Sequence, residues 1–424
     1  MIFTISPSKL KGEIRVPGSK SHSIRAIIFA LLAKGESIII NGLISDDTRS
    51  CLSAASSLGA DVDLRGNSWK IVSEGPENFQ KTSIDVGNSG TTLRLLTAAA
   101  AVSEKKIFFD GDESIRKRPM GPLLRSLSDL GAKYSCKEKE GFCPFSIKGP
   151  CGGGKTTVDG TTSQFLSAIL ISAPLFPGNT VLETPRLNEK PYVQITLDWL
   201  KSVEADVKQE NMKIFQISGN KKYRPLKTSI PGDFSAAAFP LTAALITKSD
   251  ILIKGLDMKD PQGDKELFEI VSRMGGNISE TPEGIMVKGS SSELRGAVID
   301  LNNTPDALPA AAVICAYAEG LSEIVNVEHA RIKESDRISV MCAELRKMGA
   351  SITEKKDGLI IEGGHPLKGA RVEGEKDHRI VMALSCAGMG AEGETEVTCA
   401  EAASVTFPEF YDRFRELGAR IEKA

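Results

Sequence analysis

Two carboxylates in separate polar loops are the side chains of this sequence best suited to exchanging protons. Asp306 lies in the segment TPDALPA, and Glu334 lies in RIKESDR. A carboxyl group acts as a general acid or base when it is held beside the proton that moves. On an exposed helix, the charges of RIKESDR would form only a salt-bridged face. Their place on a connection between a strand and a helix favours a directed role instead.

Cations and hydrogen-bonding groups gather in loops of the same kind. Several of these loops precede an apolar helix, whose first N–H groups and dipole favour an anion. Arg118 ends a run of three cations, and Pro119 fixes the backbone after it, which favours a directed guanidinium. Gly90 permits a close backbone approach. The candidate cations are Lys20, Arg25, Arg118, Lys333, Arg337 and Arg379, and the candidate neutral groups are Ser21, Thr162, Ser163 and Gln164.

The sequence does not carry the patterns of several other chemistries. The eight cysteines include no CxxC pair, and the four histidines have no HxxxH spacing, so we expect neither a structural zinc site nor a disulfide framework. Asp110, Asp112 and Glu113 lack the remaining spacing of a calcium loop. We assign no metal, and we find no nucleophile triad and no dinucleotide fingerprint. The candidate carboxylates, cations and neutral polar groups together suit the transfer of a group between two small anionic substrates.

Composition limits the class of protein. The chain has 424 residues, 41% of them hydrophobic and 25% charged, with a formal net charge of −2. These values predict a folded protein of more than one domain, and the charge argues against a nucleic-acid partner. The first residues lack the apolar core of a signal peptide, and no apolar run reaches the roughly 18 residues of a membrane span. We expect a cytoplasmic protein without a membrane partner.

The elements that must position these residues belong to an internal repeat. An amphipathic helix that ends in a Leu-Gly-Ala-like turn recurs at steps of roughly 70 residues, well above the periods of solenoids. Its copies are SSLGADV, SDLGAKY, KSVEADV, SRMGGNI, RKMGASI and RELGARI. In phase with it recur a short strand, a polar loop and a helix that is apolar nearly all round, as buried helices are. Each unit therefore reads as strand, buried helix, strand, exposed helix and two strands, an α/β repeat.

Six such units predict two lobes of three repeats each. The best boundary lies near RPLKTSIPGDF, where Pro225 and Pro231 flank the start of the fourth unit. The repeats alone leave open which lobe the first strand joins.

The segment GPCGGGKT at residues 149–156 has the spacing of a nucleotide-binding loop. Such a loop holds phosphates only where it opens a helix. Here it enters the strand-like TTVDG, at the place where the other repeats carry Lys11-Gly12 or Lys227-Thr228. We therefore expect a hairpin connection and no ATP site.

Seven motifs carry a resemblance to a known family. In chain order they are PGSKSHSIRA, GNSGTTLRLL, RPMGPLL, DGTTSQFLSA, PDALPA, RIKESDR and DHRIVMAL. With them the sequence closely resembles the 5-enolpyruvylshikimate-3-phosphate synthases through all six repeats. The resemblance implies a two-lobed inside-out α/β barrel of six βαβαββ repeats with the active site in the cleft. It also implies that residues 1–17 join 230–424 in the C-terminal lobe, and that 18–229 form the N-terminal lobe.

The resemblance implies an activity and residue roles. The enzyme would transfer the enolpyruvyl group of phosphoenolpyruvate to the 5-hydroxyl of shikimate 3-phosphate, as a monomer without a cofactor. Asp306, Glu334 and Lys20 would be catalytic: Asp306 would accept the hydroxyl proton, and Glu334 would exchange a proton at the methylene. Shikimate 3-phosphate would be held by Lys20, Ser21, Arg25, Thr162, Ser163, Gln164, Tyr192, Asp306 and Lys333. Phosphoenolpyruvate would be held by Lys20, Gly90, Arg118, Gln164, Arg337 and Arg379.

Three positions depart from the pattern that many family members share. Glu189 stands where many have serine, which puts a phosphate contact there in doubt. His329 stands where many have asparagine and could still donate a hydrogen bond. Val405 stands where some have lysine, which leaves one phosphoenolpyruvate cation unaccounted for.

Two other functions are compatible with a chain of such repeats. The UDP-N-acetylglucosamine enolpyruvyl transferases share the repeat architecture, but they usually carry a reactive cysteine shortly before an Arg-Pro, and FDGDESIRKRP has none. A repeat protein that binds other proteins in its grooves would not need so many directed cations in its helix-entry loops.

Overall fold

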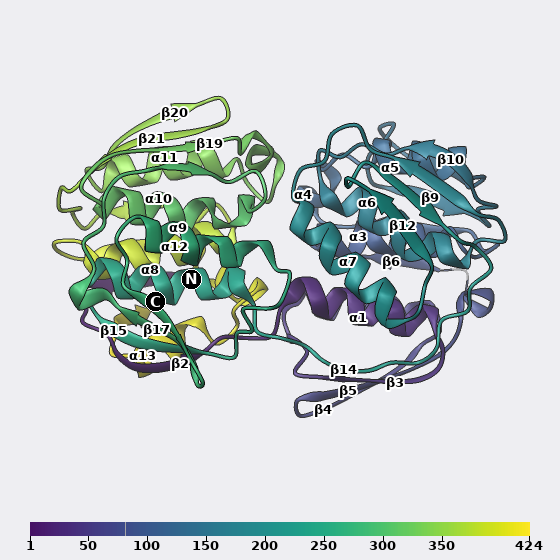
Figure 1. The fold of residues 1–424 in the computed structure, drawn as a ribbon, viewed down its shortest axis with the longest axis horizontal. Coiled ribbons are helices and arrows are strands. Elements are labelled where there is room, and N and C mark those ends of the chain that lie inside the picture. The colour runs from purple at the N-terminus through teal and green to yellow at the C-terminus, as the bar shows by residue number, and fades with distance from the viewer. Residues whose placement is uncertain (81) are drawn as a thin grey trace. The chain divides into compact units, whose positions relative to one another are not determined.

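The computed structural model describes residues 1–80 and 82–424. The chain divides into two compact units (Figure 1). Unit 1 comprises Met1–Pro17 and Gly232–Ala424, and unit 2 comprises Gly18–Pro231. Each unit contains three four-stranded sheets formed by described residues.

The fifth repeat shows the plan on which the repeats are built. In chain order it consists of β18 (Val298–Asp300), α10 (Leu308–Tyr317), β19 (Gly320–Val325), α11 (Arg337–Lys347), β20 (Ser351–Lys355) and β21 (Gly358–Gly363). Its sheet has the order β18-β19-β21-β20, in which β18 is parallel to β19 and the other two pairs are antiparallel. A parallel pair needs a crossover, and the buried helix α10 provides it. The predicted βαβαββ unit is therefore confirmed.

Unit 2 follows this plan three times with one exchange: β14 (Lys227–Ser229), from the start of the fourth repeat, pairs with β3 (Lys34–Ile40), while β2 (Lys11–Arg15) of the first repeat pairs with β15 (Asp250–Lys254) in unit 1. Its sheets are β14 (Lys227–Ser229)-β3 (Lys34–Ile40)-β5 (Ser68–Glu74)-β4 (Asp61–Arg65), β6 (Ser83–Asp85)-β7 (Ile107–Asp110)-β9 (Phe145–Lys148)-β8 (Lys133–Cys136), and β10 (Gly154–Thr157)-β11 (Thr180–Glu183)-β13 (Ile214–Ile217)-β12 (Val207–Glu210). Its inner helices are α1 (Lys20–Leu32), α3 (Gly90–Ala100) and α6 (Ser163–Ser172). The other helices are α2 (Asp46–Ser57), α4 (Glu113–Arg116), α5 (Gly121–Asp129) and α7 (Lys190–Ser202).

Unit 1 holds the fifth repeat and two further sheets. These are β2 (Lys11–Arg15)-β15 (Asp250–Lys254)-β17 (Gly284–Lys288)-β16 (Ile278–Thr281) and β22 (Arg371–Val372)-β23 (Thr395–Thr398)-β1 (Ile2–Ser6)-β24 (Arg420–Lys423). The inner helices are α8 (Phe234–Ile246), α10 and α12 (His378–Gly390), and the outer ones are α9 (Glu266–Arg273), α11 and α13 (Phe410–Glu416).

The N-terminal strand completes the last repeat. In the other sheets the third place belongs to the repeat's own final strand, but the chain ends after β24. Strand β1 fills that place and pairs antiparallel with both β23 and β24. Phe3 and Ile5 of β1 are buried in the core of unit 1. The two ends of the chain therefore build one sheet together.

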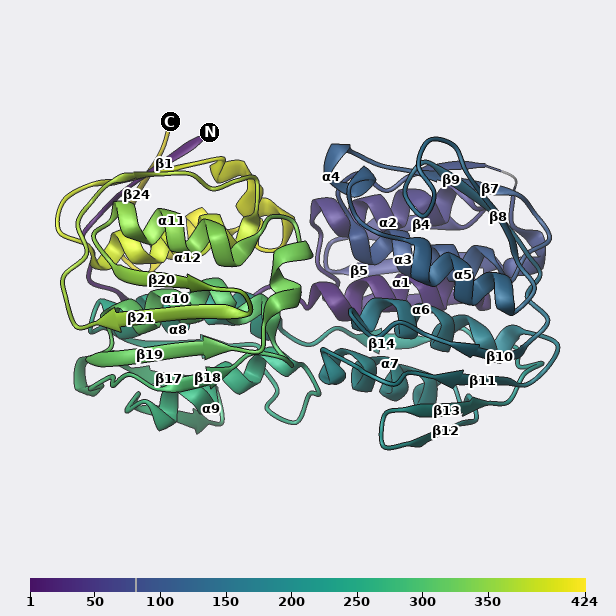
Figure 2. The same cartoon turned by 90° about the horizontal axis from the view of Figure 1, so that it is seen from above.

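The three inner helices of unit 1 lie side by side within their sheets (Figure 2). Every residue of α8 is buried, and α10 and α12 are buried over nearly their whole length. A helix that is apolar all round stays folded only when it is enclosed on all sides. The prediction that these helices are buried is confirmed. Among the described residues, no helix combines the length and apolarity needed to cross a bilayer.

The turn after each outer helix requires a left-handed residue. Gly59, Gly131, Gly275, Gly349 and Gly418 have φ between +90° and +112° there. Glu204 occupies the same turn in the third repeat with φ 56°. Glycine reaches this region without a steric penalty, which explains why five of the six repeated turns share it.

The GGGKT segment forms the start of a strand. Gly154–Thr157 is β10, and the next helix, α6, begins only at Ser163. Lys155 extends to Glu183 on the paired strand β11, with Nζ 2.7 Å from Oε1. The prediction that this segment enters a strand and not a helix is confirmed. The connection is not the expected hairpin, because β9 and β10 belong to different sheets. The lysine is occupied by a surface ion pair.

We expect Lys155→Ala to leave turnover nearly unchanged. An exposed ion pair contributes about 0–1 kcal/mol to stability, so the melting temperature should also change little. Steady-state kinetics and a thermal melt with and without ATP check both points. A large loss of activity, or stabilisation by ATP, would contradict the conclusion that this segment only starts a strand and binds no ATP.

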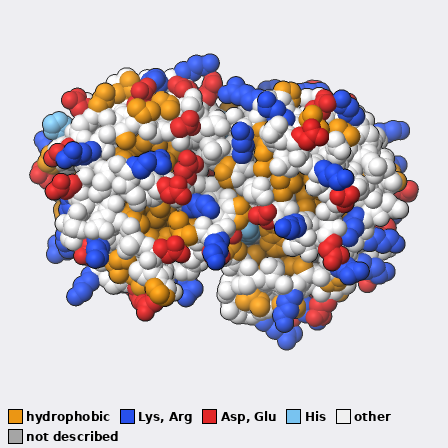
Figure 3. Space-filling model, in the orientation of Figure 1, with side chains coloured by type: hydrophobic (Ala, Val, Ile, Leu, Met, Phe, Trp, Pro, Cys, Tyr) orange, Lys and Arg blue, Asp and Glu red, His pale blue; other side chains and the backbone are white. Residues whose placement is uncertain are grey.

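Charges of both signs are interspersed over the face that Figure 3 shows. This distribution matches the net charge of −2. On this face, an anion-binding site would therefore need a few converging side chains, because the face is not broadly basic.

Candidate active site

The predicted residues fall into two sets, one in each unit. The unit 2 set starts at the N-termini of the inner helices. Lys20, Gly90 and Ser163 are the first residues of α1, α3 and α6. The side chains of Ser89 and Thr162 cap α3 and α6. Because the dipole of a helix and the N–H groups of its first turn favour negative charge, these loops are suited to hold anions.

Lys20 is held by a carboxylate of the neighbouring outer helix. Its Nζ lies 3.1 Å from Oδ2 of Asp47 in α2. The carbonyl of Asp47 also accepts a bond from Thr92 in α3. Asp47 therefore ties Lys20 to the start of the next inner helix and fixes the direction of the ammonium group.

Arg25 lies beneath its loop. Its guanidinium donates to Thr196 Oγ1, Ser167 Oγ and the carbonyl oxygens of Ser21 and Tyr192. Burial lowers the pKa of Arg25 to about 10, which leaves it charged at neutral pH. The structure thus brings three predicted residues together, and Arg25 positions the backbone at the other two.

Only the last member of the three-cation run turns inward. Arg116 pairs with Asp110, and Lys117 pairs with Glu113, both on the surface. Arg118 is 6% exposed and donates to Asn88 Oδ1 at 2.7 Å and to Ser114 Oγ at 3.1 Å. The carboxylates that could have suggested a cation loop serve these ion pairs, while Asp112 caps α4.

Arg94 is a buried cation that the sequence analysis missed. Its Nη1 donates to Gln164 Oε1 at 2.5 Å, and Gln164 Nε2 donates to Thr91 Oγ1 at 3.1 Å. The guanidinium also lies over the ring of Phe165. An arginine within the apolar run GTTLRLL was a usable signal, because an arginine is almost never buried without a partner.

Gly90 is crowded by two of these guanidiniums. A Cβ at this position would lie 2.7 Å from Arg118 Nη1 and 3.2 Å from Arg94 Nη1. Both atoms end flexible side chains, and the backbone of Gly90 is helical, so alanine is compatible with the fold. The substitution instead displaces the guanidiniums of Arg118 and Arg94 and changes the direction in which they donate hydrogen bonds.

On the phosphoenolpyruvate-binding role that the resemblance implies for Arg118, we expect Gly90→Ala to raise the KM for phosphoenolpyruvate and to leave the melting temperature nearly unchanged. The increase should be roughly tenfold, which is part of the ~1.5–3 kcal/mol of a hydrogen bond to a charged group. Steady-state kinetics with each substrate varied in turn measure the effect. An unchanged KM for phosphoenolpyruvate would show that Arg118 does not bind it.

Thr162 and Ser163 converge on a carboxylate. Glu189 Oε2 accepts bonds from Ser163 N, Ser163 Oγ and Thr162 Oγ1. Glu189 is 2% exposed and directly precedes α7. The position at which the sequence departs from the family pattern therefore lies at the start of α6, in contact with two predicted substrate ligands.

The unit 1 set is built around Arg337, the first residue of α11. Its Nη1 lies 2.7 Å from Asp306 Oδ1, its Nη2 lies 2.6 Å from Glu334 Oε2, and its Nε lies 2.8 Å from Asp377 Oδ2. Arg337 is 1% exposed. Burial would lower its pKa, but Asp377, Glu334 and Asp306 together raise the pKa well above its usual value.

Asp306 is shared between two guanidiniums. Arg379 Nη2 contacts its Oδ2 at 2.8 Å, opposite the contact from Arg337. Burial would raise the pKa of Asp306, but Arg379, Arg337 and Lys333 hold it well below its usual range. Asp306 still keeps 20% of its side chain exposed, so solvent or a ligand can reach it.

Asp377 is the member of this set that was not assigned a role. It caps α12 by accepting from Arg379 N, and its carboxylate also accepts from Ser335 Oγ. Its side chain has no exposed surface, and it fixes Arg337 through the contact with Nε. His329 is buried in the short helix Glu328–Ile332 nearby in sequence.

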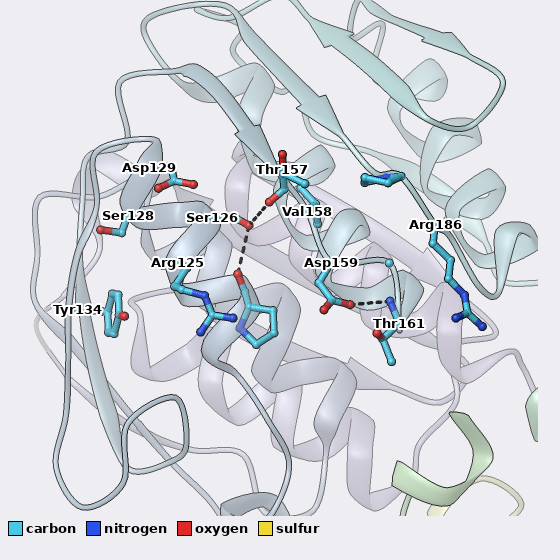
Figure 4. A pocket seen from close by; sticks show the side chains of 13 residues that line it. Arg125, Ser126, Ser128, Asp129, Tyr134, Thr157, Val158, Asp159, Thr161 and Arg186 are labelled. Carbon is cyan, nitrogen blue, oxygen red and sulfur yellow. Dashed lines mark hydrogen bonds between the residues drawn. The ribbon is translucent and has the colours of Figure 1, made fainter. Parts of the chain in front are cut away.

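A pocket of about 620 Å³ lies elsewhere in unit 2 (Figure 4). Arg125, Ser126, Tyr134, Asp159 and Arg186 are among its lining residues, and Figure 4 shows their side chains around it. The lining set, taken over the described residues, contains none of the predicted site residues. Within that part of the chain there is also no group of three or more potential metal ligands.

Comparison with known proteins gives one family. A family model described as EPSP synthase (3-phosphoshikimate 1-carboxyvinyltransferase) matches residues 5–414. The 3-phosphoshikimate 1-carboxyvinyltransferase of Acetivibrio thermocellus is 46% identical over 423 residues, which cover 99% of each chain. That of Methanococcoides burtonii is 43% identical over 429 residues, again covering 99% of each. A solved structure of EPSP synthase from Acinetobacter baumannii matches with a TM-score of 0.84 at 29% identity and covers 99% of both chains.

Proposed function

This chain belongs to the EPSP synthase family, and on that premise we propose how its residues carry out the reaction. The enzyme transfers the enolpyruvyl group of phosphoenolpyruvate to the 5-hydroxyl of shikimate 3-phosphate and releases phosphate, a step of the shikimate pathway. The alternative, transfer to UDP-N-acetylglucosamine, is not favoured, since the matching family and relatives are 3-phosphoshikimate transferases. The fold is the two-lobed inside-out α/β barrel of six repeats.

Proton transfer makes the enolpyruvyl group reactive. Glu334, or Lys20, protonates the methylene carbon, so that the adjacent carbon becomes electrophilic. The 5-hydroxyl adds to that carbon while Asp306 accepts its proton, which gives a tetrahedral intermediate. The bond to the phosphate oxygen then breaks, phosphate leaves, and Glu334 takes a proton back from the methyl group. Fixed cations stabilise the charge that moves onto the phosphate.

The network around Arg337 is the observation that carries these roles. Arg337 and Arg379 already bind one carboxylate, that of Asp306. We assign to both arginines the carboxylate of phosphoenolpyruvate, which presents the same group. When the substrate takes over these donors, Asp306 loses two of the three cations that keep its pKa low. Its pKa then rises towards the pH at which it must accept a proton.

The unit 2 residues hold the rest of the substrates. Arg118 and Gln164 bind phosphoenolpyruvate near Gly90, and Lys20 contacts both substrates. Lys333 supplies a cation from unit 1. The remaining ligands that we assign to shikimate 3-phosphate are Ser21, Arg25, Thr162, Ser163 and Tyr192. Arg25 also positions the backbone of Ser21 and Tyr192, to whose carbonyl oxygens it donates hydrogen bonds.

Phosphate release with each acceptor tests the function. Purified protein is mixed with phosphoenolpyruvate and either shikimate 3-phosphate or UDP-N-acetylglucosamine, and phosphate is followed by a coupled assay. We expect release only with shikimate 3-phosphate. Release only with the nucleotide sugar would overturn the assignment, and release with neither would remove the enzymatic proposal.

We also propose that the enzyme is a cytoplasmic monomer. The eight cysteines are all free, as is usual in a reducing compartment. The large apolar side chains that the described residues expose are few: Leu64 and Phe108 lie on separate strands, and Val298 and Leu321 lie on the paired strands β18 and β19. Light scattering on the purified protein and fractionation of cells test the two statements, and a dimer mass or a secreted protein would refute them.

A further inference from the structure

Glu189 is a buried carboxylate that the reaction described above does not use. It lies between β11 and α7, with 2% of its surface exposed and backbone angles of φ 55° and ψ 40°. Neighbouring Asn188 anchors this loop through bonds from its N–H to the Gly160 carbonyl and from its Nδ2 to the Thr161 carbonyl. The loop therefore holds the carboxylate against the start of α6.

One oxygen of Glu189 collects three donors. Its Oε2 lies 2.7 Å from Ser163 Oγ, 3.0 Å from Ser163 N and 3.3 Å from Thr162 Oγ1. Helix α6 has a cap without it, because Thr162 Oγ1 accepts from Gln164 N. A backbone N–H at a helix start and two hydroxyls around one oxygen form the arrangement that binds a phosphate oxygen.

We propose that Glu189 occupies the phosphate site of shikimate 3-phosphate in the unliganded enzyme and thereby sets the affinity for this substrate. The proposal rests on the proposed function, which assigns Thr162 and Ser163 to that substrate. The carboxylate acts as an internal substitute for the phosphate, and the two anions cannot use the same donors at once.

This arrangement has a quantitative consequence for binding. Shikimate 3-phosphate binds after the Glu189 side chain has left the start of α6, so the observed Kd is the intrinsic Kd divided by the fraction of molecules with an open site. The substrate phosphate also meets a nearby negative charge, which opposes binding. A residue without the carboxylate removes both effects, while the donors on Thr162 and Ser163 remain.

Two substitutions separate the contributions. Glu189→Ser removes the carboxylate and shortens the side chain. Glu189→Gln keeps the shape of the side chain but removes its charge. Glu183→Gln is the matched control, because it removes one negative charge from the same unit, at the surface pair with Lys155. Isothermal titration calorimetry measures the Kd of each protein for shikimate 3-phosphate, for shikimate without the phosphate, and for inorganic phosphate.

We expect Glu189→Ser to lower the Kd for shikimate 3-phosphate by about tenfold. This is the factor expected if Glu189 occupies the phosphate site in about nine of ten unliganded wild-type molecules, so that about one in ten has an open site. Glu189→Gln should shift it in the same direction by less. The Kd for shikimate should change little, and that for inorganic phosphate should fall with that for shikimate 3-phosphate. The unliganded serine variant should melt at a lower temperature than the wild type, because Thr162 and Ser163 lose their acceptor.

The opposite result overturns the proposal. If both variants bind shikimate 3-phosphate more weakly or equally, Glu189 supports the loop and does not occupy the phosphate site. A gain for shikimate as large as that for its phosphate would also exclude it. The proposed function is judged separately, by phosphate release in the wild type. If that assay fails, the variant-to-wild-type ratio for inorganic phosphate still decides what Glu189 does.

Discussion

Replacing Asp306 with asparagine is expected to lower kcat by about 10²–10⁴-fold, the range for a positioned acid or base. The amide keeps the shape of the side chain but cannot accept the hydroxyl proton. Its bonds from Arg337 and Arg379 also become weaker, because the acceptor is no longer charged. Phosphoenolpyruvate should then compete more easily for the two guanidiniums, so its Kd should stay the same or fall.

This combination distinguishes a catalytic Asp306 from a structural one. Steady-state kinetics give kcat, and equilibrium binding gives the Kd for phosphoenolpyruvate. Asp300→Asn is the matched control, since Asp300 is an exposed residue of β18 in the same unit and bonds only to loop groups there in the described chain. A folded Asp306→Asn protein with nearly wild-type kcat would show that another group accepts the proton.

The pH dependence of stability gives an independent check on Asp306. Its pKa is lower in the folded protein than in the unfolded chain, so the ionised form stabilises the fold. This contribution is fully present above the unfolded pKa of about 4 and is lost as the pH falls towards the lower folded value. Denaturation between neutral pH and pH 3 should therefore show a smaller acid-induced loss of stability in Asp306→Asn than in the wild type. An equal loss in both would mean that the two arginines do not hold the carboxylate in solution.

Much of the fold could be predicted because its signals are local and repeated. The apolar helices had to be enclosed whatever their neighbours were, and the period of the turns gave the number of repeats. The pairing of β1 with β23 and β24 could not be predicted from the repeats, because it joins strands almost a whole chain apart. Strand pairing of this kind depends on the three-dimensional path of the chain and not on the residues of the strand alone.

The candidate site also has a part that local sequence signals predict and a part that they do not. Pro119 was a local signal for the inward direction of Arg118, which is buried while Arg116 and Lys117 are not. The bonds from Arg337 to Asp306 and Asp377 cross 31 and 40 positions of sequence, and no pattern within one loop predicts them. The roles of these residues at the substrates stay predictions, since they come from the resemblance and are supported by geometry alone.

Both units show a protein carboxylate at donors that we assign to a substrate anion. Asp306 holds Arg337 and Arg379 in unit 1, and Glu189 holds Thr162 and Ser163 in unit 2. Buried charges need partners, so a site made for anions is costly to leave without one. Internal carboxylates satisfy the donors of the unliganded enzyme, and each substrate anion gains only the difference between its own bonds and theirs.

Replacing Arg337 with methionine is expected to destabilise unit 1 by about 3–5 kcal/mol, the usual cost of removing one partner from a buried ion pair. Methionine fills a similar volume, so the effect measures lost charge and hydrogen bonds more than lost packing. Asp377, with no exposed side-chain surface, loses its bonds from Nε and Nη2, and Asp306 and Glu334 each lose one bond. Arg337→Lys should recover only part of the stability, because an ammonium group cannot bridge three carboxylates as a planar guanidinium does.

Urea denaturation followed by circular dichroism measures this loss, and the matched control is Arg413→Met in α13 of the same unit. Arg413 pairs with Glu409 and Glu416 on the surface, where such pairs contribute about 0–1 kcal/mol. Adding Asp377→Asn to Arg337→Met should restore part of the stability, because Asp377 is the most deeply buried of the three carboxylates that lose Arg337. Two results would show that the charges of this network do not stabilise unit 1. In the first, Arg337→Met loses no more stability than the control. In the second, the double variant is less stable than Arg337→Met alone.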